Sequence, residues 1–92
     1  PKEYKSYLYL AKIFNKNEKD EETEKNLNNV LLLNPNNDEA MYLLILLKIK
    51  QSDYSKSSEL IENFVKVCNL FCSKEKEIKS KLDKIDPDNE KN

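Results

Sequence analysis

The apolar residues of this chain fall into five segments, and each segment has the spacing of three and four residues that marks one face of a helix. The pattern predicts helices over 3–14, 20–33 and 39–50, a fourth that begins at 54, and a last one over 73–85. The segment 39–50 is apolar almost all the way around. It is therefore predicted to be the core helix, covered on more than one side.

Within each predicted helix, one set of side chains is expected to face inward. The first helix contributes Tyr7, Leu10, Ala11 and Phe14, the second Leu27, Val30 and Leu31, and the fourth Tyr54, Ser57, Leu60, Ile61, Phe64 and Val65. The last helix has one narrow stripe of Ile78, Leu82 and Ile85. Its exposed side is expected to carry the i,i+4 pairs Glu75/Lys79 and Glu77/Lys81.

Polar residues between the segments supply the helix ends. Asn34-Pro35 disfavours helical backbone and removes a donor, and the residues 36–38 can cap the next helix, so the centre of the chain is a turn between two helices. The acidic run 20–22 places carboxylates at the positive end of the second helix, and charge runs of this kind are usually solvated. Neither stretch needs a functional explanation.

A shift of the first two helices by 34 residues superimposes them on the next two with size and polarity largely preserved. It lays Tyr7 on Met41, Leu10 on Leu44, Ala11 on Ile45, Thr23 on Ser57, Leu27 on Ile61, Val30 on Phe64 and Pro35 on Asn69. A period of 34 residues in helix-turn-helix units, with W-x2-L-G-x2-Y, A-x3-F and P, is the pattern of tetratricopeptide repeats. The chain resembles two such repeats, over 4–37 and 38–71, followed by a capping helix over 73–86.

This resemblance implies an all-α fold of five helices, in which antiparallel helical hairpins stack as a short right-handed α-solenoid. A single domain is expected over 1–86, with a disordered tail at 87–92. The second repeat departs from the family at Ile45 and Phe64, where the family prefers small residues that let helices approach closely.

Members of the family commonly hold a peptide or a helix of another protein in a groove lined by the first helix of each repeat. The resemblance therefore implies a scaffold for protein–protein interaction. The expected groove residues are Leu8, Tyr9, Lys12, Asn15, Tyr42, Leu43, Leu46 and Ile49, flanked by Lys5 and Glu39. The same apolar side chains could instead be core, in a purely structural fragment of a longer solenoid, or could join two copies of this chain.

Chaperone-binding members of the family grip a terminal carboxylate with basic and amide side chains at set places. Those places fall here on Leu8, Lys12, Leu43, Ser73 and Glu77, so one cation stands against one carboxylate. The carboxylate clamp is absent from this sequence, and an apolar helix or an extended apolar segment is the expected occupant of the groove.

Composition restricts the remaining classes of function. The net charge of -1 comes from interspersed signs, so nucleic acid is not an expected partner. The sequence has no glycine for a phosphate-binding loop and no histidine for a triad, and we expect neither an enzyme nor a cofactor.

The two cysteines, Cys68 and Cys72, lie four residues apart. In a continuous helix this spacing does not favour a disulfide, and without histidine a metal site is not expected, so both are predicted to be buried free thiols. Free thiols favour a reducing compartment, and no apolar stretch approaches the length of a membrane span. The expected location is therefore the cytoplasm, with no membrane contact by this segment.

Overall fold

A computed structural model describes residues 3–91 of the chain, and these residues form an all-α protein without strands. The α-helices are α1 Tyr4–Lys16, α2 Asp20–Leu33, α3 Asp38–Lys50, α4 Tyr54–Val67 and α5 Glu75–Ile85. Short 3₁₀ helices occupy Cys72–Lys74 and Pro87–Lys91. The predicted all-α fold with five α-helices is confirmed for the described part of the chain.

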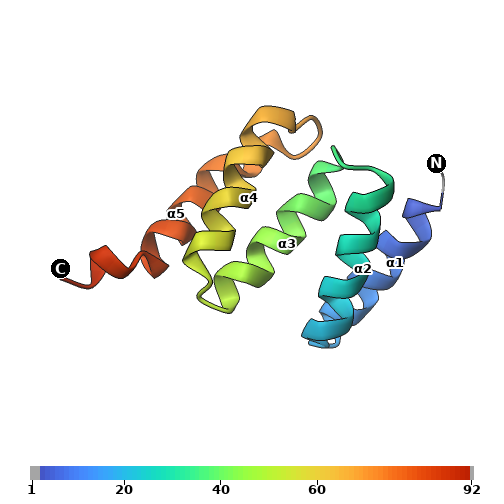
Figure 1. Cartoon of the computed structure of the whole chain (residues 1–92), viewed down its shortest axis with the longest axis horizontal. Coiled ribbons are helices and arrows are strands. Elements are labelled where there is room, and N and C mark those ends of the chain that lie inside the picture. Colours follow the sequence, from blue (N-terminus) through green and yellow to red (C-terminus); the bar gives the residue numbers. More distant parts are fainter. Residues whose placement is uncertain (1–2, 92) are drawn as a thin grey trace.

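The helices lie side by side in chain order along the long axis of the molecule, as Figure 1 shows, within an envelope of 45 × 28 × 18 Å. Short connections make α1 with α2 and α3 with α4 into antiparallel hairpins, and α5 packs at the end of the row against α4 and α3. The hydrophobic core is centred on α3, which packs against α2, α4 and α5. The prediction that 39–50 is the core helix is confirmed.

The predicted helix ends have their expected chemistry at the centre of the chain. Asn34 leaves the helical region with φ −142° and ψ 81°. The side chain of Asn37 then caps α3 by accepting a hydrogen bond of 2.8 Å from the backbone N–H of Ala40. The acidic residues 20–22 form the first turn of α2, as the sequence predicts.

Two residues predicted to face inward are exposed in the structure. Leu10 on α1 is 41% exposed, because α1 lies at the end of the row and packs mainly on α2. Val65 on α4 is 40% exposed, since it faces a gap between α4 and α5. Periodicity identifies the apolar side of a helix, but it does not say which neighbour is present to cover it.

The prediction of free cysteines in a continuous helix is wrong. Helix α4 ends at Val67, and the backbone turns extended at Cys68, with φ −59° and ψ 149°. The following turn brings the Cα atoms of Cys68 and Cys72 to 5.2 Å, and the two residues form a disulfide. The sequence has no proline or glycine at this helix end, so its pattern predicts that the helix continues through both cysteines. The prediction fails because the helix ends before Cys68.

Beyond α5, the described chain continues into the segment predicted to be a tail. Pro87–Lys91 continue beyond α5 as a 3₁₀ helix, in which the side chain of Asn89 donates a hydrogen bond of 3.0 Å to the carbonyl of Asp83. Asn92, the last residue of the predicted tail, lies outside the described residues.

The 34-residue period places Thr23 of α2 and Ser57 of α4 at equivalent, buried positions. The Thr23 hydroxyl donates a hydrogen bond of 2.7 Å to the carbonyl of Lys19. Ser57 is 0% exposed, and its hydroxyl has no hydrogen-bond partner among residues 3–91. Removing a buried hydroxyl that lacks a partner eliminates a desolvation cost, whereas removing a bonded one does not.

We therefore predict that Ser57→Ala raises the free energy of unfolding by about 1 kcal/mol, whereas Thr23→Ala lowers it by about 1 kcal/mol. Urea unfolding followed by circular dichroism measures both changes. A loss of stability in Ser57→Ala would show that the hydroxyl is bonded in the folded protein.

The disulfide gives a second prediction. Iodoacetamide should leave the mass of the native chain unchanged and should add to two thiols only after reduction by dithiothreitol. Because the cross-link restricts the unfolded chain, reduction is expected to lower the free energy of unfolding by about 2 kcal/mol. A Cys68→Ser, Cys72→Ser variant should be insensitive to dithiothreitol. Alkylation of two thiols before reduction would contradict the disulfide.

Candidate functional site

The eight residues predicted to line a groove come from α1 and α3. On α1, Leu8 is half-buried and Tyr9, Lys12 and Asn15 are exposed; on α3, Tyr42, Leu43, Leu46 and Ile49 are all half-buried. The five half-buried side chains pack against the core, so they contribute to stability while part of their apolar surface stays in contact with water. They are neither fully buried nor free.

An ion pair connects the two groups of residues. Lys12 of α1 pairs with Glu39 in the first turn of α3, and the Lys12 side chain remains 49% exposed. This contact holds part of α1 next to the start of α3. Tyr9, one turn before Lys12, is 67% exposed and is the most open aromatic side chain in the described part of the chain. We call the eight groove residues the α1/α3 face.

Tyr42, at the start of this face, has neighbours from the C-terminal part of the chain. Its hydroxyl donates to the Glu77 carboxylate, at 3.1 Å and 3.3 Å from the two oxygens. Its ring centroid lies 5.6 Å from that of Phe71, and the Lys74 ammonium lies 5.7 Å from the ring centroid. Burial, and then the Glu77 carboxylate, raise the pKa of Tyr42 above its ordinary value. Within the α1/α3 face, Tyr42 therefore lies at the edge next to the turn 68–72 and α5.

Of the two ion pairs predicted on α5, one is present in the described structure. Lys79 pairs with Glu75 at 2.8 Å, as expected. Glu77 is half-buried and accepts its hydrogen bond from Tyr42 instead. The i,i+4 spacing describes one helix in isolation, and it carries no information about a hydroxyl that arrives from α3.

The contacts around Tyr42 depend on Asp38, the first residue of α3. The Asp38 residue is 5% exposed, and one of its carboxylate oxygens accepts hydrogen bonds of 2.7 Å from the backbone N–H groups of Asn69 and Phe71. Burial raises the pKa of Asp38, but hydrogen bonds from the amides of Asn69, Phe71 and Leu70 outweigh it and bring the pKa below its ordinary value.

Asp38 thus fastens the disulfide-closed turn 68–72 to the start of α3. That turn carries Phe71 onto the Tyr42 ring and leads directly into α5. The sequence predicts Asp38 only as a possible cap for its own helix. Its contact with the turn could not have been found by motif, because the donors are main-chain amides that any residue except proline supplies.

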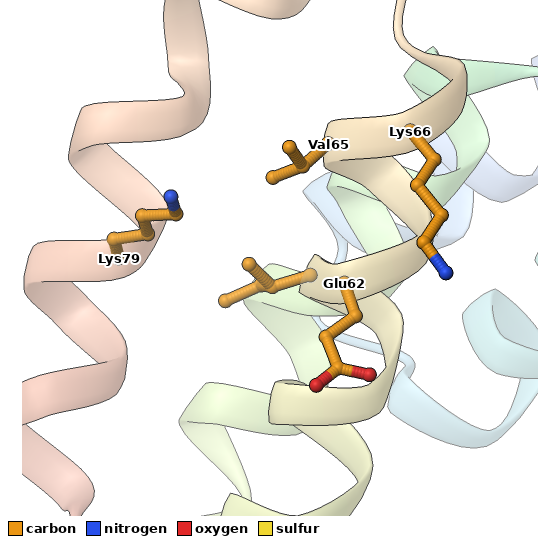
Figure 2. Close-up of a pocket in the computed structure, with 5 residues that line it drawn as sticks. Glu62, Val65, Lys66 and Lys79 are labelled. Atoms are coloured by element: carbon orange, nitrogen blue, oxygen red, sulfur yellow. The ribbon is translucent and has the colours of Figure 1, made fainter.

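A pocket that the sequence did not predict opens between α4 and α5. It has a volume of about 470 Å³ and is lined by Ile61, Glu62, Val65, Lys66 and Lys79. Figure 2 shows Val65 of α4 and Lys79 of α5 pointing toward one another across it. Two apolar side chains with lysines and a glutamate around them form a shallow amphipathic surface rather than an enclosed site.

Residues 3–91 contain neither a metal-binding cluster nor a membrane span. No group of three or more His, Cys, Asp or Glu residues in this range has the arrangement to hold a metal ion. No helix in the same range combines the length and the apolar character needed to cross a membrane.

Comparisons with protein-family models, with curated proteins and with solved structures find no match to this chain. Its function is therefore inferred from the internal 34-residue period and from the contacts described above.

The contacts of Asp38 predict that the free energy of unfolding decreases as the pH falls. Because its pKa is lowered in the folded state, Asp38 stabilises the protein above about pH 4 and loses this contribution as the pH falls through the lowered folded-state pKa. Asp38→Ala is expected to lower the free energy of unfolding at neutral pH by about 3 kcal/mol and to flatten its decline on acidification.

Urea unfolding between neutral pH and pH values below the carboxylate range measures both effects. Asp53→Ala is the matched control, because Asp53 caps α4 with one exposed hydrogen bond and should cost only about 1 kcal/mol. Equal losses in the two variants would contradict a special role for Asp38.

Proposed function

We propose that this chain is a protein–protein interaction module that binds an apolar segment of a partner protein, helical or extended, on the α1/α3 face. The observation that carries the proposal is the combination of the largely exposed Tyr9 ring with the half-buried apolar side chains of α1 and α3. A surface of this kind is stable without a partner, yet it gains free energy when a partner removes its remaining contact with water.

The energetic scale is adequate for specific binding. Full burial of an apolar side chain stabilises by about 1.5–3 kcal/mol, so completing the burial of several side chains supplies a useful fraction of a micromolar affinity. The leucines at 43 and 46 are already fixed by packing against the core, which reduces the entropy lost when a partner orders them further.

The arrangement that we propose for the binding face is a short right-handed solenoid. The order of the helices along the molecule supports it, as does the position of the Lys12–Glu39 pair, which joins the first helices of the two predicted repeats. Residues at Ile45 and Phe64, larger than the family prefers, are both 0% exposed and are therefore accommodated within the core.

A binding role also fits the chemistry of the buried Asp38 carboxylate and of the half-buried Tyr42 hydroxyl. The Asp38 carboxylate is occupied by backbone amides, and the Tyr42 hydroxyl is occupied by Glu77. Both groups have shifted pKa values for reasons that are structural, so neither supports a catalytic assignment.

The disulfide bears on where this module acts. Disulfides persist in oxidising compartments and are rare in the cytosol. The Cys68–Cys72 bond therefore supports an oxidising compartment, in place of the cytoplasmic location expected from free thiols. Trapping thiols by alkylation before lysis of the source cells tests this part of the proposal.

Selection of a displayed library of random peptides on the full chain tests the binding face. We expect the selected peptides to be rich in apolar residues and to lose affinity by at least about tenfold for Tyr9→Ser and for Leu43→Ser, Leu46→Ser. Leu32→Ser is the matched control, because Leu32 is 79% exposed on α2 and is not part of the α1/α3 face.

Circular dichroism and thermal melts establish that each variant is folded. Tyr9→Ser removes an exposed side chain and should melt with the wild type, so its result is independent of any loss of core packing in the double variant. Peptides that bind Tyr9→Ser and wild type equally, or the absence of any selected peptide, would contradict the proposal.

A further inference from the structure

The first helices of the two repeats differ in how well one side of each is covered. Leu10 and Ile13 of α1 correspond, 34 residues later, to Leu44 and Leu47 of α3. Leu44 and Leu47 are 2% and 4% exposed, whereas Leu10 and Ile13 are 41% and 39% exposed. The same apolar pair is therefore core in one repeat and surface in the other.

The neighbours of the two helices identify what is missing. Helix α3 packs against α2, α4 and α5. Under the 34-residue shift, α2 takes the place of α4 beside α1, and α3 takes the place of α5, with the Lys12–Glu39 pair at that contact. The neighbour of α3 that has no counterpart beside α1 in the described structure is α2. The outer side of α1 thus presents Leu10 and Ile13 without a helix in the position that α2 takes beside α3.

The contact between α2 and α3 also gives the charge of a matching helix. Glu24 pairs with Lys48 at 2.9 Å, and Asp20 in the first turn of α2 pairs with Lys50 at 3.1 Å. Lys16 of α1 is the equivalent of Lys50 and is exposed. The equivalent of Lys48 in α1 is Phe14, and Lys12 already pairs with Glu39, so Lys16 is the lysine of α1 that favours an acidic residue in the first turn of a neighbouring helix.

We propose that the outer face of α1, formed by Leu10, Ile13 and Lys16, docks an amphipathic helix of a partner protein that begins with acidic residues and runs antiparallel to α1, as α2 runs to α3. This surface adjoins the α1/α3 face on α1. At about 100° per residue, Leu10 lies about 160° around the helix axis from Leu8, but Ile13 lies only about 40° from Tyr9. Variants of Leu43 and Leu46, which belong to α3, therefore distinguish the two surfaces.

The α2 segment itself supplies a probe with the required chemistry. A synthetic peptide of residues 20–33, titrated into the ¹⁵N-labelled full chain, should shift amide resonances of α1 around Leu10 and Ile13. Leu10→Ser, Ile13→Ser in the chain should weaken this binding by at least about tenfold, and so should a peptide with Asp20, Glu21 and Glu22 replaced by lysine.

Two control variants distinguish binding at the outer face of α1 from binding elsewhere on the chain. Leu32→Ser, on exposed α2 surface, and Leu43→Ser, Leu46→Ser, on the α1/α3 face, should both bind the peptide as the wild type does. If the peptide loses affinity for the Leu43→Ser, Leu46→Ser variant but not for the Leu10→Ser, Ile13→Ser variant, the proposal is overturned. That result would instead support binding on the α1/α3 face.

A fused chain keeps the test decisive, because a free peptide of this length is a marginal helix in water. The full chain is extended at its N-terminus by a second copy of residues 4–37, which places an α2 helix before the original α1. Amide hydrogen exchange in the original α1 should then slow by at least about tenfold relative to the unextended chain. Unchanged exchange would overturn the proposal. Dimerisation of the unextended chain that is abolished by Leu10→Ser, Ile13→Ser would also overturn it, because the occupant of the outer face would then be a second copy of this chain.

Discussion

The buried carboxylate of Asp38 is the interaction on which the C-terminal half of the molecule depends. A carboxylate taken out of water is strongly destabilising unless hydrogen bonds replace its hydration. Here the replacement comes from main-chain amides of Asn69, Phe71 and Leu70, all within the turn closed by the disulfide. The turn presents its donors in one direction, and the carboxylate fixes where that turn lies against α3.

Several features follow from this anchor. The turn places Phe71 against the Tyr42 ring, and α5, which begins shortly after Cys72, brings Glu77 to the Tyr42 hydroxyl. Tyr42 is thereby fixed at one edge of the α1/α3 face. The second hairpin and α5 are held together by these contacts as well as by the core, whereas α1 at the opposite end of the row keeps an uncovered apolar side. The two ends of the molecule thus differ in how much of their apolar surface is buried.

The helices could be predicted from the sequence because local rules determine them. Apolar spacing identified five helices, the Asn-Pro turn and the cap at Asn37 explained the central break, and the all-apolar character of 39–50 identified the core helix. Long-range contacts lay outside these rules. The disulfide was not predicted because no proline or glycine marks the end of α4. The Asp38 contact was not predicted because its donors are main-chain amides. The exposure of Leu10 was not predicted because periodicity does not reveal which neighbouring helix is absent. Among the predicted groove residues, the covering of Tyr42 by the turn and α5 was not predicted by the sequence.

The central role of Asp38 is tested most directly by an NMR titration of its side-chain carboxyl carbon in the ¹³C-labelled full chain, followed together with the amide protons of Asn69 and Phe71. We predict a midpoint below the ordinary aspartate value of about 3.9, with both amide protons moving at the same midpoint as the carboxyl carbon. A midpoint at or above that value, with amide protons that do not respond, would contradict this role.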